Sequence, residues 1–482
     1  MGVRVELVHK LREICGEGHV ITAAHQLKTY ESDGLLQYAV TPGAVVLPAD
    51  AAQTQAVVRA CFDAGTPWVA RGAGSGLSGG ALPVADGVVI GLSRLKRILS
   101  VDLENARVVV EPGVTNIAVS QAVAPTHFYP PDPSSQIVCT IGGNVAENSG
   151  GAHCLKYGFT TNYVLSVDAV LTDGTAVTIG GPEADRPGYD LLGALVGSEG
   201  TLAVVTRITL RVAPVPESVR TLVAFFESPG AAGGAVSAIT EAGVVPGAIE
   251  MMDNLTIQAA EPMAHAGFPL DAGAALLVEL DGSEQECEAR FEEVEAFCTA
   301  AGATEVRIAR DEAERQRFWK ARKAAFASMG RVAHAYLVQD GVIPRTKLPE
   351  VLERIAELGR EYDMRVANVF HAGDGNLHPL VCYDRPQDAA RATELSERIL
   401  DACLELGGSI TGEHGVGHDK KKHMTKQFAE PDLAAFQMLR CAFDPHGLAN
   451  PGKLMPTPRL CGEVPGEYRP HPLEEAGLAE RF

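Results

Sequence analysis

The segment HAGDGNLH, residues 371–378, limits the possible folds more than any other stretch of the sequence. Its Gly-Asp-Gly-Asn centre consists of turn-forming residues, so it cannot continue a helix. The residues before it, 364–370, have the composition of a strand. We therefore expect His371 to end a strand and His378 to begin the next segment. The turn between them should fold the two imidazole rings toward one another.

Two neutral imidazoles brought together in this way are typical metal ligands. A third ligand is available in SITGEHGVGH, where Glu413 stands between Gly412 and His414. Two histidines and one carboxylate leave coordination positions open, as a catalytic metal site requires. We predict that His371, His378 and Glu413 bind a divalent metal, and zinc, manganese and iron remain alternatives. The competing interpretation is that these are ordinary turn histidines.

Charge and length exclude several classes of protein. The formal net charge is −20, which argues against nucleic acid or an anionic membrane as the main partner, because each would repel the chain. The 482 residues predict two or three domains. Because no apolar run of about 18 residues occurs, we expect no transmembrane helix. The first residues lack the pattern of a signal peptide, so we expect a cytoplasmic protein.

The ten cysteines include no C-x-x-C pair. A zinc ribbon or a ferredoxin-type cluster is therefore not indicated. In the expected cytosolic setting all ten should be reduced thiols. Any iron–sulfur relay would have to be carried by another chain.

The glycine-rich segment RGAGSGLSGGALP, residues 71–83, imitates a dinucleotide-binding turn. Three of its glycines have the G-x-G-x-x-G spacing: Gly74, Gly76 and Gly79. Such a turn must open a helix, whereas Pro83 and a strand pattern at 87–92 follow here, so we reject that interpretation. Consecutive uncovered N–H groups can instead form an anion nest for a pyrophosphate, with Arg71 at its entrance. The alternative is a flexible loop without a ligand.

Three further segments carry expectations. Residues 130–151 are rich in Gly, Pro, Ser and Asn but too apolar for disorder, so we expect an irregular segment that wraps a ligand. The basic run at 420–422 is interpreted as a solvated helix start, with a contact to a cofactor phosphate or a partner chain as the alternative. A composition change at 214–216 indicates a domain boundary.

Taken together, six segments resemble the FAD-linked oxidase family of the vanillyl-alcohol oxidase/p-cresol methylhydroxylase (PCMH) type: RGAGSGLSGGA, PPDPSSQIVCTIGGNVAENSGGAHCLKYG, GSEGTL, HAGDGNLHP, SITGEHGVG and FDPHGLANPGK. The resemblance covers nearly the whole chain and is strongest to the flavin-bearing D subunits of bacterial glycolate oxidases. It implies an α+β fold with a two-lobed PCMH-type FAD-binding domain at residues 1–215. A substrate or cap domain would follow at 216–410, and residues 411–482 would complete the active site and the FAD domain.

The resemblance also assigns roles to single residues. His371, His378 and Glu413 match the family's metal ligands, His414 its catalytic base and Arg322 its carboxylate-binding arginine. Asn376 could donate to the metal shell or the substrate, or be only a turn residue. Contacts to FAD, expected to be non-covalent, fall on the following residues: Arg71, Gly72, Gly74, Ser75, Gly76, Asp132, Thr140, Gly142, Gly143, Asn148, Gly151, Glu199 and Gly200.

The implied reaction is the FAD- and metal-dependent oxidation of a small 2-hydroxy acid. The first candidate is the oxidation of glycolate to glyoxylate. Val338 stands where relatives that oxidise D-2-hydroxyglutarate carry a lysine, which favours a monocarboxylate. The alternatives are a D-lactate dehydrogenase with a quinone or cytochrome acceptor, a flavin-free metallohydrolase, and a flavoprotein without catalysis. The resemblance further implies companion subunits, one of a flavin type and one carrying iron–sulfur clusters, through which the chain could attach to the inner face of the membrane.

Overall fold

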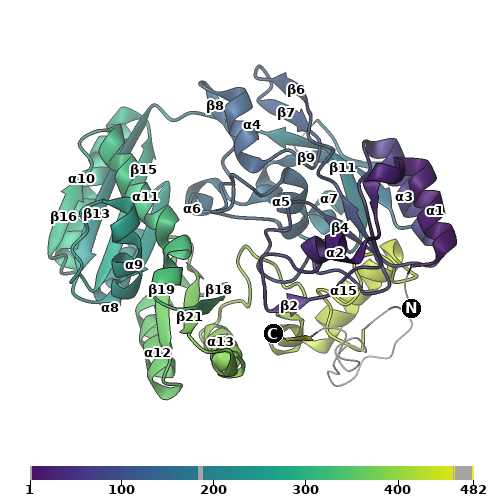
Figure 1. The fold of residues 1–482 in the computed structure, drawn as a ribbon. Coiled ribbons are helices and arrows are strands. Elements are labelled where there is room, and N and C mark those ends of the chain that lie inside the picture. The colour runs from purple at the N-terminus through teal and green to yellow at the C-terminus, as the bar shows by residue number, and fades with distance from the viewer. Residues whose placement is uncertain (1–2, 183–187, 460, 462–479, 482) are drawn as a thin grey trace. The chain divides into compact units, whose positions relative to one another are not determined.

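The computed structural model describes residues 3–182, 188–459, 461 and 480–481 (Figure 1). By its internal contacts the chain forms two compact units. The first unit contains Met1–Ser149, Phe159–Val215 and His414–Phe482, and the second contains Gly150–Gly158 and Pro216–Glu413. Both units mix helices and strands, as the α+β prediction requires.

The first unit contains a four-stranded sheet in the order β1-β3-β5-β4, in which β3, β5 and β4 are parallel. Its strands are β1 Val20–Ile21, β3 Ala44–Val46, β4 Trp68–Arg71 and β5 Val88–Gly91. Helices α1 Val5–Cys15 and α3 Ala51–Asp63 share one apolar core with this sheet. The carboxylate of Asp50 accepts the Gln53 N–H at 2.8 Å, and Gly65 follows the helix with φ +61°. The predicted start and end of α3 are confirmed.

An antiparallel five-stranded sheet, in the order β10-β9-β11-β7-β6, is the other large sheet of the first unit. Its strands are β6 Ile98–Asp102, β7 Arg107–Val110, β9 Val164–Leu171, β10 Ala176–Gly180 and β11 Ala203–Arg211. Strands β9 and β10 form the hairpin expected from Asp173-Gly174. Two short antiparallel pairs, β8 His127–Phe128 with β12 Ala213–Pro214 and β2 Tyr38–Ala39 with β22 Glu480–Arg481, accompany it. The remaining helices before the second unit are α2 Ala24–Leu27, α4 Asn116–Val123, α5 Ile141–Glu147 and α7 Leu191–Leu195.

Helix α5 corrects the expectation that residues 130–151 are irregular throughout. The helix forms although Gly142 and Gly143 lie in its first turn. A Cβ on Gly142 would lie 2.6 Å from Pro112 Cβ, so this glycine serves close packing and not a bend in the chain. Asn148 then ends the helix in the left-handed conformation, at φ 52°. Composition alone suggested a loop because it does not distinguish these two uses of glycine.

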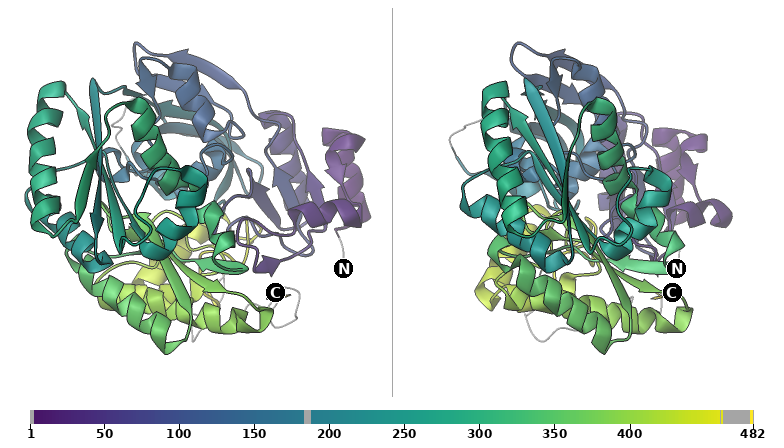
Figure 2. Two further views of the ribbon diagram at one scale, coloured as in Figure 1. Left: turned by 60° about the vertical axis from the view of Figure 1, so that its left-hand side comes forward. Right: turned by 90° about the vertical axis from the view of Figure 1, so that its left-hand side faces the viewer.

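The second unit is built on a nine-stranded sheet (Figure 2). The order is β16-β13-β15-β14-β19-β20-β18, and β21 joins β19 to β17. Its strands are β13 Ser218–Phe226, β14 Ala248–Asp253, β15 Ala274–Gly282, β16 Glu305–Ile308, β17 Ala335–Val338, β18 Gly341–Val342, β19 Arg365–His371, β20 Asn376–Leu377 and β21 Pro379–Tyr383. All pairings in this sheet are antiparallel.

Helices cover both faces of this sheet (Figure 2). On β13, Leu222, Ala224 and Phe226 belong to one apolar cluster, and Val223 and Phe225 belong to the other. This alternation follows from the two-residue period of a strand. Helices α8 Pro229–Glu241, α10 Glu284–Ala300, α12 Leu348–Glu361 and α13 Ala389–Glu405 supply the first cluster. Helices α9 Asn254–Ala264 and α11 Glu312–Ser328 supply the second.

Residues 150–158, with helix α6 Cys154–Tyr157, leave the first unit and pack on the second, although their place in the sequence put them in the FAD domain. Two acidic residues of β15 hold this segment. Lys156 Nζ lies 2.6 Å from Asp281 Oδ1, and the Tyr157 hydroxyl donates to Asp281 Oδ2 at 2.5 Å. His153 Nε2 lies 3.5 Å from Glu279 Oε1. These contacts join residues more than 120 positions apart, so no local sequence pattern predicts them.

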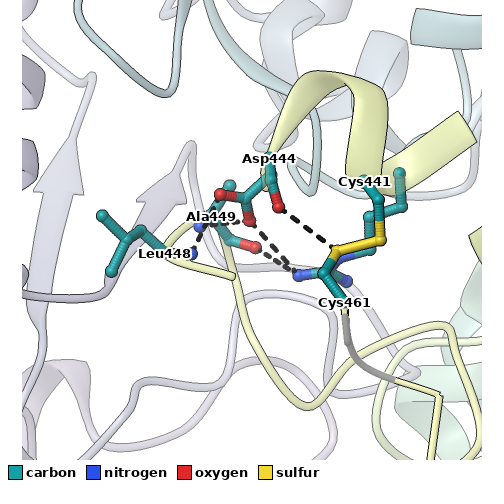
Figure 3. The surroundings of a disulfide bond; sticks show 6 residues. Cys441, Asp444, Leu448, Ala449 and Cys461 are labelled. Carbon is teal, nitrogen blue, oxygen red and sulfur yellow. Dashed lines mark hydrogen bonds and ion pairs between the residues drawn. A yellow bond between two sulfur atoms is a disulfide. The ribbon is translucent and has the colours of Figure 1, made fainter. Parts of the chain in front are cut away.

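The chain ends with α14 Met424–Gln427 and α15 Glu430–Phe443, followed by a segment that returns to α15 (Figure 3). There Cys441 and Cys461 form a disulfide with a Cα–Cα distance of 5.6 Å. The prediction that all ten cysteines are reduced is therefore wrong for this pair, because the returning chain brings two cysteines without a sequence motif together. The other eight are free and buried. In the part of the chain that the structure describes, no helix has the length and apolarity to cross a membrane.

Candidate active site

Sheet pairing places the two predicted metal-binding histidines side by side. His371 ends β19, and its cross-strand partners are Glu250 of β14 and Asn376 of β20. Gly375 takes a positive φ of 80° in the turn, which a residue with a side chain rarely adopts. The rings of His371 and His378 have centroids 5.1 Å apart and are nearly perpendicular. The expected strand–turn–strand geometry is confirmed.

Hydrogen bonds determine which ring nitrogen of each histidine is available to a ligand. His371 Nδ1 lies 2.7 Å from Glu250 Oε1, and His378 Nδ1 lies 3.3 Å from the carbonyl oxygen of Gln339. A carboxylate and a carbonyl only accept hydrogen bonds, so each Nδ1 carries a hydrogen and each neutral ring keeps its lone pair on Nε2. Both Nε2 atoms face one oxygen, Glu413 Oε1, at 3.3 Å from His371 and 3.0 Å from His378.

The loop that carries Glu413 is fixed by the buried carboxylate of Asp340. This carboxylate accepts the Thr411 hydroxyl at 2.6 Å, the Gly412 N–H at 3.0 Å and the Glu413 N–H at 3.2 Å. Three donors on one carboxylate orient the backbone of the loop, and the side chain of Glu413 is thereby directed to the histidines.

The electrostatics of this cluster favour a positive charge at its centre. Burial opposes the charged form of His371, but the carboxylates of Glu250 and Glu413 outweigh it and hold the pKa of His371 well above its ordinary value. Burial would raise the pKa of Glu413, but His371 and His378 outweigh this effect and hold that pKa well below its usual range. Two lone pairs and a carboxylate oxygen at about 3 Å repel one another unless a proton or a cation lies between them.

This donor set fits a divalent metal ion. One ligand atom from each of His371, His378 and Glu413 lies within 4.8 Å of the other two, and all three residues are buried. Two imidazole nitrogens and one carboxylate oxygen suit zinc, manganese or iron. The three predicted ligands therefore come together in space, and their binding of a metal remains a prediction.

Arg322 and Asn376, two further predicted residues, lie in the same unit. Arg322 on α11 is buried, so the alternative of a surface salt bridge is wrong. Its Nε donates to Glu250 Oε2 at 2.5 Å, whereas Nη2 is buried and has no hydrogen-bond partner among the described residues. The side chain of Asn376 packs against Gly412, and its Oδ1 is also buried without such a partner. An unsatisfied buried polar atom is costly unless a ligand or water completes it.

Sequence reasoning missed Glu250 and Asp340, which hold His371 and the 411–413 loop. Glu250 lies in the apolar stretch AIEMMD, and an acidic residue inside such a strand is a signal that could have been followed. The contacts of Glu250 with His371 and of Asp340 with the 411–413 loop cannot be found from the sequence alone, because each joins residues more than 70 positions apart.

In the first unit, two glycines of the predicted FAD-binding loop, Gly72 and Gly74, leave no room for a side chain, whereas the space beside Gly76 is open. The loop after Arg71 contains no helix, which confirms the rejection of a dinucleotide-binding turn. A Cβ on Gly72 would collide with the hydroxyl of Thr140, which is buried and has no hydrogen-bond partner among the described residues. A Cβ on Gly74 would collide with the guanidinium of Arg71. Burial lowers the pKa of Arg71 from its ordinary value, although Asp33 acts against this effect.

The other predicted FAD contacts are distributed over both units. Ser75, Gly76, Asp132, Gly142, Gly143, Asn148 and Gly200 belong to the first unit, and Gly151 belongs to the second. The carboxylate of Glu199 accepts the N–H groups of Val416 and Gly417 at 2.7 and 2.8 Å, so it holds the segment that follows Glu413. His414 begins that segment and belongs to the first unit, whereas Glu413 ends the second.

The basic run at 420–422 corrects an expectation. Lys420 and Lys421 are buried, so they do not begin a solvated helix. Nearby Lys453 is also buried, and burial together with the charge of Lys421 lowers its pKa to about 7. The burial of these lysines contradicts the solvated helix start, and a contact to a cofactor phosphate or to a partner chain stays a prediction.

Two sequence families match this chain. The FAD-linked oxidase C-terminal domain matches residues 215–454, and an FAD-binding domain matches residues 42–180. The chain is 50% identical over 482 residues to the glycolate oxidase subunit GlcD of Escherichia coli strain K12, covering 99% of this chain and 97% of that protein. The chain belongs to the FAD-linked oxidases. The predicted family and the FAD cofactor are confirmed.

This FAD-linked oxidase also resembles more distant proteins. A D-lactate dehydrogenase of Anaerostipes hadrus is 31% identical over 465 residues, with 94% of this chain and 98% of that protein covered. The crystal structure of p-cresol methylhydroxylase superposes with a TM-score of 0.77 at 16% identity, over 94% of this chain and 98% of that one. The predicted PCMH-type fold is thereby confirmed. The alternative prediction of a flavin-free metallohydrolase is wrong, because the chain matches an FAD-binding domain.

Proposed function

We propose that this FAD-linked oxidase oxidises a small 2-hydroxy acid, glycolate first, with a divalent metal held by His371, His378 and Glu413. The observation that carries the proposal is the convergence of both Nε2 atoms on one oxygen of Glu413. The names of the relatives support the substrate class, since one is a subunit of glycolate oxidase and another is a D-lactate dehydrogenase.

The oxidation of glycolate removes the hydroxyl proton and, from the same carbon, a hydride. When bound, FAD would accept the hydride, and a divalent metal in this donor set would polarise the hydroxyl and lower its pKa toward neutral. His414 follows Glu413 directly and is proposed as the general base that takes the proton. This assignment keeps the expectation from the family resemblance.

Arg322 is proposed to bind the carboxylate of the substrate. Its Nε is held by Glu250, and its buried Nη2 has no partner among the described residues, so one donor is available. A charge-assisted hydrogen bond of this kind contributes about 1.5–3 kcal/mol. Asn376 is proposed to contribute its amide to the metal shell or the substrate.

The size of the substrate is inferred from Val338. This residue pairs with Leu380 at the end of β17, and an apolar side chain there offers no charge for a second carboxylate. We therefore favour glycolate, with D-lactate as the second candidate. We also infer that the chain works with companion subunits, because the E. coli relative is named as a subunit.

Anaerobic reduction of the bound flavin tests the substrate. Glycolate, D-lactate, L-lactate and D-2-hydroxyglutarate are added to the flavin-loaded protein, and its visible absorbance is followed. The proposal predicts rapid bleaching by glycolate and slow bleaching by D-2-hydroxyglutarate. Bleaching by D-lactate alone would keep the reaction class and replace the substrate. No bleaching by any 2-hydroxy acid, with co-purifying partners present, would contradict the proposal.

A further inference from the structure

Glu250 stands between the predicted substrate-binding arginine and one predicted metal ligand. Its Oε2 accepts from Arg322 Nε at 2.5 Å, and its Oε1 accepts from His371 Nδ1 at 2.7 Å. The three residues come from β14, α11 and β19 and are at most 3% exposed. Both oxygens of one carboxylate are thus used by two functional side chains.

The sheet register fixes this arrangement. Glu250 and His371 are direct cross-strand partners, so their side chains project from the same face of the sheet. The contact therefore does not depend on a flexible loop. Arg322 lies across this face on α11, where its charge compensates the buried carboxylate.

The position of Glu250 has a chemical consequence for His371. Because the carboxylate can only accept, His371 keeps its hydrogen on Nδ1 and presents the lone pair of Nε2 to Glu413. Histidines that bind a metal commonly donate their other ring N–H to such a group. Losing that partner weakens metal binding about 10–100-fold.

We propose that Glu250 is a positioning residue that fixes the tautomer and orientation of His371 and, with its other oxygen, the orientation of Arg322. This inference rests on the proposed metal site and deepens it. It predicts that one substitution at Glu250 weakens both metal binding and the binding of the substrate carboxylate, although Glu250 itself contacts neither.

The variants Glu250→Gln and Glu250→Leu test the inference. The amide of glutamine has one accepting oxygen in place of two, so it can serve only one of the two donors. Metal-stripped, flavin-loaded protein is equilibrated by dialysis against buffered zinc, with a parallel series in manganese, and the bound metal is measured by elemental analysis. We expect Glu250→Gln to weaken metal binding about 10–100-fold and Glu250→Leu to weaken it at least as much. At saturating metal, Glu250→Gln should also raise KM for glycolate.

Glu279→Gln is the matched control. Glu279 lies on β15 of the same sheet, is equally buried, and accepts from Arg315 Nε and Trp319 Nε1 at 2.8 and 2.7 Å. It makes no hydrogen bond to His371 or His378 among the described contacts. Its loss should lower stability without changing metal affinity, which separates positioning from general destabilisation.

The possible outcomes separate a failure of the proposed metal site from a failure of the role proposed for Glu250. Failure of the wild-type protein to bind either metal would overturn the proposed metal site itself. One equivalent bound equally tightly by wild type and Glu250→Gln would leave the metal site intact and overturn the role of Glu250. An equal loss in Glu279→Gln would overturn it as well. Flavin absorbance reports folding, and Glu250→Gln decides the question even where Glu250→Leu does not fold.

Discussion

At the scale of single residues, local chemistry made some side chains predictable and long-range pairing hid others. His371 and His378 could be predicted because a Gly-Asp-Gly-Asn turn between two strands leaves few ways to place them. Glu413 could be predicted because SITGEHGVGH offers a carboxylate, between Gly412 and His414, as the third ligand that a divalent ion would need. Glu250 could not, because its role comes from a cross-strand register that the sequence does not encode locally.

Arg322→Lys tests the proposed substrate contact. Lysine keeps a positive charge but lacks the planar fork, so it cannot bond Glu250 through one nitrogen while offering another to a carboxylate. We expect KM for glycolate to rise at least tenfold, a change of about 1.4 kcal/mol, with a smaller effect on kcat. Steady-state kinetics with an artificial acceptor measures both. Arg315→Lys on the same helix is the control, and an unchanged KM in Arg322→Lys would exclude the contact.

Glu279 gives a prediction about pH and stability. Burial alone would raise its pKa, but hydrogen bonds and charge from His153 and Arg315 hold the folded-state pKa well below its ordinary value. The ionised form therefore stabilises the fold at neutral pH, and this contribution is lost as pH falls below the unfolded pKa of about 4.3.

Replacing Glu279 by glutamine should accordingly cost about 1.5–3 kcal/mol at pH 7, because the charge-assisted hydrogen bonds from Arg315 are lost, whereas Arg315 is partly exposed and keeps its ion pair with Glu312. The difference from wild type should shrink as the pH is lowered toward 3. Denaturant unfolding at a series of pH values measures the free energy. A difference that stays constant with pH would show that the carboxylate charge is not the cause.

At the scale of elements, capping and strand patterns were readable, whereas the use of glycine was not. Helix α3 and the β9–β10 hairpin follow from local residue preferences. Helix α5 was mistaken for a loop because Gly142 is required by Pro112, far away in sequence. The disulfide between Cys441 and Cys461 was also missed, because the two cysteines stand 20 residues apart and belong to no sequence motif.

Gly142→Ala tests this account of α5. Alanine normally stabilises a helix interior relative to glycine by roughly 0.5–1 kcal/mol. Here its Cβ would lie 2.6 Å from Pro112 Cβ, so overpacking should instead destabilise the first unit by about 1–3 kcal/mol. Gly234→Ala in α8 is the control, because no atom lies within 4 Å of the added carbon. Equal melting temperatures for the two variants would contradict the packing argument.

At the scale of the whole molecule, the α+β fold class and its PCMH type could be predicted because the family motifs extend along nearly the entire chain. The placement of residues 150–158 in the second unit could not. The chain passes between the two units at 149/150, 158/159, 215/216 and 413/414, and only the passage near residue 215 had a compositional signal, whereas a return near residue 411 was expected from the family resemblance. The last passage separates Glu413 from His414, so neighbouring residues with proposed roles belong to different units.

The central claim is that His371, His378 and Glu413 hold a metal that flavin reduction requires. The most direct measurement is the anaerobic rate of flavin bleaching by glycolate in chelator-treated protein, before and after one equivalent of zinc, manganese or iron is added. We predict that stripping slows bleaching at least 100-fold, that one of the metals restores it, and that Glu413→Gln does not respond. Bleaching at the wild-type rate in both the stripped protein and Glu413→Gln would contradict the account.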